Sequence, residues 1–76
     1  MTKRSLTVAG HRTSISLEDP FWEALGEIAA ARGVSVAALV ATIDETRGDD
    51  ANLSAAIRIF VLDHYRKSAR QARAAR

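Results

Sequence analysis

The chain of 76 residues contains no cysteine and only two histidines. Without cysteine the fold has no disulfide bond, and two histidines with no cysteine argue against a structural zinc site. No hydrophobic run is long enough to span a membrane, and the first residues lack the apolar segment of a secretion signal. These absences predict a soluble cytoplasmic protein that holds no metal and no other cofactor.

The sequence also lacks the motifs of common catalytic sites. It has no glycine-rich phosphate loop and no nucleophile elbow, and no serine has an evident base at a useful spacing. The adjacent carboxylates stand at expected helix ends or turns, where solvation and the helix dipole explain them. We therefore expect that the protein is not an enzyme.

Few residues are available to build a core. A chain of this length hides only about 60% of the surface that its unfolded form exposes, so without disulfides or metal we expect oligomerisation to stabilise it.

The net charge of +2 is unevenly distributed along the chain. Residues 1–17 carry three basic side chains and no acid, residues 18–50 are acidic, and residues 51–76 carry six basic side chains against one acid. This pattern fits a surface for polyanions or self-assembly of basic with acidic segments.

One strand is predicted, over residues 11–17. This segment, HRTSISL, alternates polar and apolar residues, which is the period of a strand with one face buried. The acids and proline of Glu18-Asp19-Pro20 follow directly and suit the first turn of a helix. Because a single strand leaves its N–H and C=O groups unpaired, it needs a partner strand.

Three helices are predicted after the strand, each with apolar residues at helical spacing. The first spans residues 20–32, the second spans 36–47, and the third begins at Asn52 or Ser54. The third has the widest apolar stripe, so we expect it to be buried on more than one side. For its basic end, residues 66–76, a solvated tail is favoured slightly over a dedicated binding face.

The order of strand, helix, Gly-x-Ser turn and helix resembles the ribbon-helix-helix superfamily of Arc- and MetJ-type repressors. Residues 13–17 resemble its ribbon strand and residues 21–31 its first helix, while Arg32-Gly33-Val34-Ser35 resembles the entry into its second helix. Residues 3–14 and 52–58 are similar to a family of short bacterial ribbon-helix-helix proteins, found mainly in alphaproteobacteria.

The resemblance implies a mainly α fold with one N-terminal β-strand and an added C-terminal helix. Two copies would form an intertwined homodimer, in which their strands pair into a two-stranded antiparallel ribbon and their helices close one shared core. Residues 1–10 would then be a basic N-terminal arm, residues 11–47 the ribbon-helix-helix core, and residues 48–76 the additional helix with its basic tail.

The resemblance also implies residues that bind DNA. With a side-chain period of two, Arg12, Ser14 and Ser16 project from the face opposite the apolar residues. A two-stranded ribbon fits the major groove of DNA, where Arg can read guanine and Ser can contact any base edge. Three further residues are expected to add charge near the DNA backbone: Lys3, Arg4 and His11. The alternative is that this polar face is merely solvated, as on any exposed ribbon.

A phosphate site is expected at the start of the second predicted helix. The N–H groups around Val34, Ser35 and Val36 and the positive end of the helix dipole suit an anion. Ser35 is equally a plausible N-cap that touches no ligand.

Two functions follow from these predictions. The first is a homodimeric DNA-binding protein, a transcriptional regulator that inserts its ribbon in the major groove of double-stranded DNA. The alternative is a non-enzymatic adaptor or antitoxin-like module, which keeps the dimer fold and binds a protein partner through the third helix or the basic tail.

Overall fold

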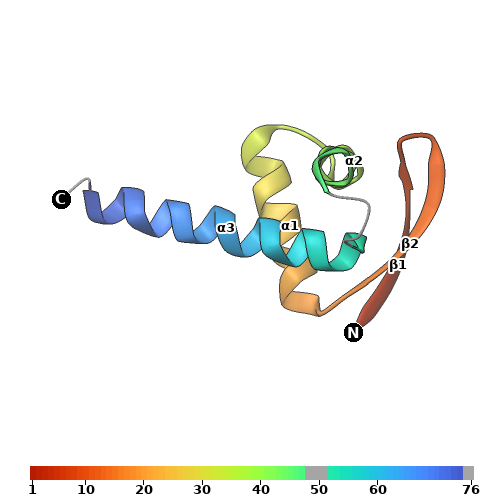
Figure 1. Cartoon of the computed structure of the whole chain (residues 1–76), viewed down its shortest axis with the longest axis horizontal. Helices are drawn as coiled ribbons and strands as arrows, with labels where there is room; N and C mark the ends of the chain where they lie inside the picture. Colours follow the sequence, from red (N-terminus) through yellow and green to blue (C-terminus); the bar gives the residue numbers. More distant parts are fainter. Residues whose placement is uncertain (48–51, 75–76) are drawn as a thin grey trace.

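The computed structural model describes residues 1–47 and 52–74, which form a β-hairpin followed by three helices. The elements are β1 (Thr2–Val8), β2 (His11–Leu17), α1 (Asp19–Arg32), α2 (Val36–Thr46) and α3 (Leu53–Ala74). Figure 1 shows the hairpin at one end of the molecule, α1 and α2 next to it, and α3 running away from it. The second half of α3 projects beyond the other elements.

The predicted helices are confirmed, and their ends follow from capping. The Ser35 Oγ accepts the Ala38 N–H at 3.0 Å, which satisfies a donor of the first turn of α2. Asn52 caps α3 in the same way, with its Oδ1 accepting the Ala55 N–H at 2.8 Å. The first part of the predicted C-terminal segment, residues 48–51, and residues 75–76 lie outside the described residues.

The strand content corrects the sequence prediction, because the described residues form two strands where one was expected. Residues 2–8, predicted to belong to an arm, form β1 and pair antiparallel with β2 along its whole length. The turn between the strands is Ala9-Gly10, with φ angles of 52° and 83°. Two consecutive positive φ values are the geometry of the two-residue hairpin turn. Alanine rarely adopts a positive φ, so the residue type at position 9 does not indicate a turn in the sequence.

The hairpin gives β2 a partner strand within its own chain. The resemblance had suggested a second copy as that partner, and the intertwined homodimer stays a prediction. The structure instead closes a core inside one chain, with buried side chains from all five elements. They are Val8, Ile15, Leu17, Trp22, Leu25, Ile28, Ala29, Leu39, Val40, Ile43, Ile57 and Val61.

Helix α3 is buried on one side only, which corrects the expectation of a helix covered on several sides. Ile57 and Val61 enter the core, whereas Ile59 is 67% exposed and Leu62 is 59% exposed. The elements that pack against α3 are α1, α2 and β2, and together they leave Ile59 and Leu62 uncovered. An apolar surface therefore remains uncovered by the described part of the chain.

Polar contacts fix α3 against the hairpin and α1. The Ser54 hydroxyl donates to the Ser16 carbonyl oxygen at 3.1 Å. The Tyr65 hydroxyl donates to Glu27 Oε2 at 2.9 Å, and this bond raises the pKa of the tyrosine. These bonds set the orientation of α3 relative to the ribbon.

Candidate nucleic-acid interface

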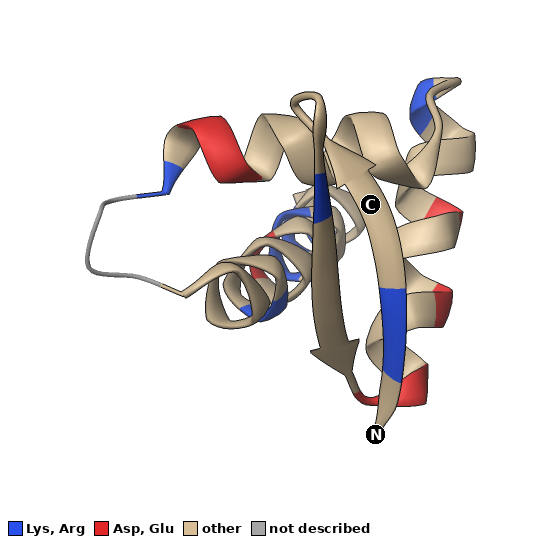
Figure 2. Cartoon of the chain, turned by 90° about the vertical axis from the view of Figure 1, so that its right-hand side faces the viewer, with Lys and Arg blue, Asp and Glu red and all other residues tan. Residues whose placement is uncertain are grey.

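The hairpin turns one face to the helices and the other to solvent. Residues paired across the strands share a face, so the register defines an outward face of six polar side chains. The outward face consists of Lys3, Ser5, Thr7, Arg12, Ser14 and Ser16. All are exposed except Ser16, which is half-buried. Figure 2 shows the hairpin in front of the helices, with nothing covering this face.

The outward face is basic. Lys3 pairs with Ser16 near the open end of the hairpin, and Arg12 pairs with Thr7 near the turn, so the two cations lie at opposite ends and on different strands. Their positions are four residues apart along the ribbon. At about 3.4 Å per residue this is a separation of about 14 Å. Neither strand carries an acid, and Lys and Arg mark both strands in Figure 2.

The six candidate DNA-binding residues divide between the two faces. Lys3 joins Arg12, Ser14 and Ser16 on the outward face, whereas Arg4 and His11 belong to the register of the inner face. The Arg4 guanidinium lies over Trp22, with Cζ 4.9 Å from the ring centroid. His11 is paired with Val8 beside the turn.

Sequence reasoning missed two members of the outward face, Ser5 and Thr7, because it treated residues 1–10 as an arm. The signal that could have found them is the alternation of residues 2–8, where Lys3, Ser5 and Thr7 interleave with Leu6 and Val8. The ribbon that had been expected from two chains is thus present in one chain.

Comparison with protein families identifies the fold. A model of the ribbon-helix-helix domain family matches residues 1–65, which include both strands, α1, α2 and the first part of α3. The chain belongs to this family. Searches of curated proteins and of solved structures found no match. Ribbon-helix-helix domains are in general DNA-binding folds rather than enzymes.

The predicted phosphate site of this ribbon-helix-helix domain is only partly free. The Val34 N–H donates to the Ala29 carbonyl oxygen at 3.0 Å, and the Ser35 hydroxyl is engaged in capping α2. Within the described residues, the N–H groups of Ser35 and Val36 have no backbone acceptor. Helix α2 crosses behind the hairpin in Figure 2, so its first turn is set back from the outward face.

The acids closest to the ribbon are held by partners. Glu18 follows β2 directly and forms an ion pair with Arg58, whose hydrogen bond lowers the pKa of the carboxyl group. Asp19 accepts a hydrogen bond from the Thr2 hydroxyl. Both residues adjoin the open end of the hairpin, since Glu18 follows the last residue of β2 and Asp19 is bonded to the first residue of β1. Their partners reduce the repulsion that they would exert on a nearby phosphate.

Neither a metal site nor a membrane span is evident in the described residues. No group of three or more His, Asp or Glu side chains there could hold a metal ion. No single helix there is long and apolar enough to cross a membrane, and α1 and α2 reach that length and hydropathy only together, across a bend of 98°.

Proposed function

We propose that the protein is a homodimeric, DNA-binding regulator of transcription in the bacterial cytoplasm, and that its hairpin enters the major groove of double-stranded DNA. The observation that carries this proposal is the uncovered outward face, with six polar side chains, two cations and no acid. Membership of the ribbon-helix-helix family supports it, since this fold binds DNA in general.

Each residue of the outward face has a proposed role. Arg12 near the turn would donate to the O6 and N7 atoms of a guanine, and Ser14 beside it would contact a neighbouring base edge. Lys3 lies about 14 Å from Arg12 along the ribbon, close to the groove width of about 12 Å, and would bind a phosphate at the groove wall. Ser5, Thr7 and Ser16 complete the polar surface around them.

The remaining candidates act at a distance from the bases. Arg4 and His11 would add attraction for the DNA backbone without reading sequence. The N–H groups of Ser35 and Val36 would receive a phosphate that passes the side of the hairpin.

The test is binding to random duplex DNA, measured by fluorescence anisotropy over a series of salt concentrations. We expect the logarithm of the affinity to fall linearly with the logarithm of the salt concentration. Combining Lys3→Ala with Arg12→Ala should lower the affinity and flatten this slope by about one unit for each phosphate that the variant no longer neutralises.

The matched controls separate the hairpin from net charge. Combining Lys67→Ala with Arg32→Ala also removes two positive charges, but on α3 and α1 away from the hairpin, and should leave the affinity and slope close to wild type. Equal reductions of affinity in the two double variants, or no binding by the wild type at low salt, would refute the proposal.

A second function is favoured by the exposed apolar residues of α3. Ile59, Leu62 and Tyr65 are 67%, 59% and 41% exposed, a surface suited to a protein contact. If the folded protein binds no DNA in the salt series, that result favours the non-enzymatic adaptor or antitoxin-like role.

A further inference from the structure

Several positive side chains of the helices contact a partner within the described structure. The engaged pairs are Arg32 with the Phe60 ring, Arg47 with Asp44, Arg58 with Glu18, and Lys67 with Asp63. Three arginines on the second half of α3 have no ion pair and no ring contact within residues 1–47 and 52–74. They form an arginine stripe that consists of Arg66, Arg70 and Arg73.

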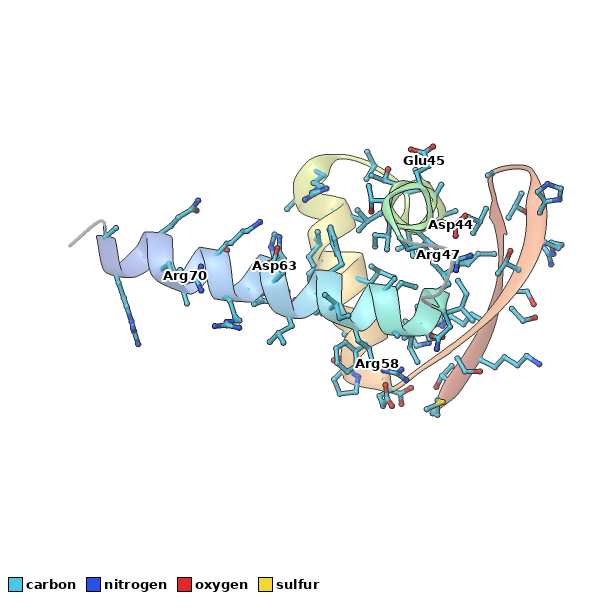
Figure 3. The ribbon with its side chains drawn as sticks, viewed as in Figure 1. Asp44, Glu45, Arg47, Arg58, Asp63 and Arg70 are labelled. Carbon is cyan, nitrogen blue, oxygen red and sulfur yellow. The ribbon has the colours of Figure 1, made fainter. Side chains whose placement is uncertain are left out.

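The arginine stripe follows one side of α3, since its members are four and three residues apart. Together with Ala69 they line an open groove of about 220 Å³. Every residue from 65 to 74 is exposed, so no other described element covers this half of the helix. Figure 3 shows Arg47 beside Asp44 in the packed part of the fold, and Arg70 on the projecting half of α3.

The arginine stripe has an electrostatic cost. Like charges three or four residues apart on a helix repel each other, and no acid follows Asp63 in the sequence. The negative end of the helix dipole stabilises a cation in the last turn, which applies to Arg73 but not to Arg66. A bound anion would relieve this repulsion, so the stripe favours a negatively charged partner.

The residue types of this segment distinguish between anionic partners. Residues 66–76 contain no aromatic side chain and no apolar side chain larger than alanine. A membrane surface requires apolar side chains that enter the lipid, a protein interface requires an apolar core, and single-stranded nucleic acid requires aromatic rings for its bases. The backbone of a duplex requires only cations, and the arginine fork suits its phosphates.

We propose that the arginine stripe binds the phosphate backbone of a second DNA duplex, separate from the one held by the hairpin. Arg66 and Arg73 are seven residues apart, which is about 10.5 Å along the helix axis. Since each strand of duplex DNA carries a phosphate about every 3.4 Å of its axis, that length meets about three phosphates, one for each arginine. Contacts to phosphates alone carry no sequence information, so this site accepts any duplex.

The two DNA sites lie far apart in the chain. The molecule measures 44 Å along its longest axis, and Figure 1 shows the hairpin and the last turns of α3 at opposite ends of that axis. A straight duplex across the hairpin therefore does not reach the arginine stripe of the same chain. The stripe binds DNA independently of the hairpin, whereas the connection of two duplexes by one chain also rests on the proposed function.

The first experiment measures the capture of a second duplex. One duplex of random sequence is fixed to beads, the protein is bound to it at low salt, and the retention of a fluorescent second duplex is recorded. We expect the wild type to retain the second duplex. Combining Arg66→Ala with Arg70→Ala should remove most of this retention while the protein still binds the fixed duplex. Alanine is the best helix former, so circular dichroism should show an intact α3.

The matched control combines Arg32→Ala with Lys67→Ala, which removes the same charge from cations that already have partners. It should retain the second duplex as the wild type does. Equal retention by the stripe variant and the wild type, or a wild type that binds the fixed duplex alone, would overturn the inference. A stripe variant that still captures DNA but no longer binds phosphatidylserine vesicles would make the stripe a membrane contact, which also overturns it.

A second measurement separates the arginine stripe from the hairpin. In the variant that combines Lys3→Ala with Arg12→Ala, the further changes Arg66→Ala and Arg70→Ala should flatten the salt dependence of binding to random duplex by about two more units, one for each lost phosphate contact. An unchanged slope would overturn the inference and leave the proposed function standing. Binding that the hairpin substitutions leave intact and the stripe substitutions abolish would refute the proposed function alone.

Discussion

Arg58 on α3 and Glu18 at the start of α1 form a two-point ion pair. The Arg58 Nε and Nη2 donate to Glu18 Oε1 and Oε2, at 2.9 and 3.1 Å. This fork geometry is the strongest form of a surface ion pair, and it links residues 40 positions apart. It fastens α3 to the junction between β2 and α1, on which the position of the hairpin depends.

The ion pair predicts a dependence of stability on pH. Since the pKa of Glu18 is lower in the folded chain than in the unfolded chain, its contribution is present above the ordinary carboxyl pKa and is lost as the pH falls through the folded value. Glu18→Gln should therefore lose less stability than the wild type between about pH 6 and pH 3, as measured by urea unfolding. The control Glu45→Gln, at an exposed acid with no ion pair or hydrogen bond among the described residues, should follow the wild type.

The fluorescence of Trp22 should report whether β1 is packed against α1. Its indole Nε1 donates to the Thr2 carbonyl oxygen at 2.9 Å, and its side chain is 4% exposed. We expect a blue-shifted emission that moves to the red only on unfolding. Trp22→Phe should lower the free energy of unfolding by about 1–2 kcal/mol, because it removes a hydrogen bond and part of the buried ring.

The control for Trp22 is Arg4→Gln, which removes the guanidinium over the ring and leaves the indole bond. It should lower the free energy of unfolding by less than about 1 kcal/mol. A larger loss of stability for Arg4→Gln than for Trp22→Phe in urea unfolding would contradict this interpretation.

A substitution in the turn of the hairpin should increase the stability of the fold. Ala9 has a φ of 52°, a conformation that asparagine adopts more readily than alanine. Ala9→Asn should raise the free energy of unfolding by about 0.5–1 kcal/mol, measured as a higher urea midpoint with an unchanged slope. The same substitution at the exposed helical position Ala30 should not raise it, since asparagine favours helices less than alanine does. A lower midpoint for Ala9→Asn would contradict the turn geometry.

Arg12 and Lys3 should differ in what they do for DNA recognition. On a duplex selected for tight binding, Arg12→Ala should cost about 1–3 kcal/mol and relax the preference at one base pair, as expected for a base contact. Lys3→Ala should weaken all sequences alike. Competition assays with single-base variants of the selected duplex measure both effects, and a uniform weakening for Arg12→Ala would argue against base reading.

The sequence predicted the helices better than the ribbon, for local reasons. Ser35 and Asn52 mark helix starts through side-chain caps that depend only on neighbouring residues. The hairpin depends on Ala9-Gly10, where alanine occupies a position that asparagine or aspartate commonly fills. Without that turn signal the alternation of residues 2–8 was interpreted as an arm, and Ser5 and Thr7 were missed.

Because residues 1–10 were expected to form an arm, the sequence did not show which face of the ribbon Lys3 and Arg4 occupy. Lys3 and Arg4 are neighbours in the sequence, yet a strand directs them to opposite faces, and only Lys3 shares the face of Arg12. The exposure of Ile59 could not be predicted either, since a wide apolar stripe on a helix does not show which side the rest of the chain covers.

The hairpin's outward face points along the axis of α3, since the face is seen front-on in Figure 2 where α3 is viewed from its end. A duplex that filled this face would lie across one end of the molecule, and the projecting half of α3 would extend away from the DNA. That half of the helix would stay accessible to other molecules while the hairpin is occupied.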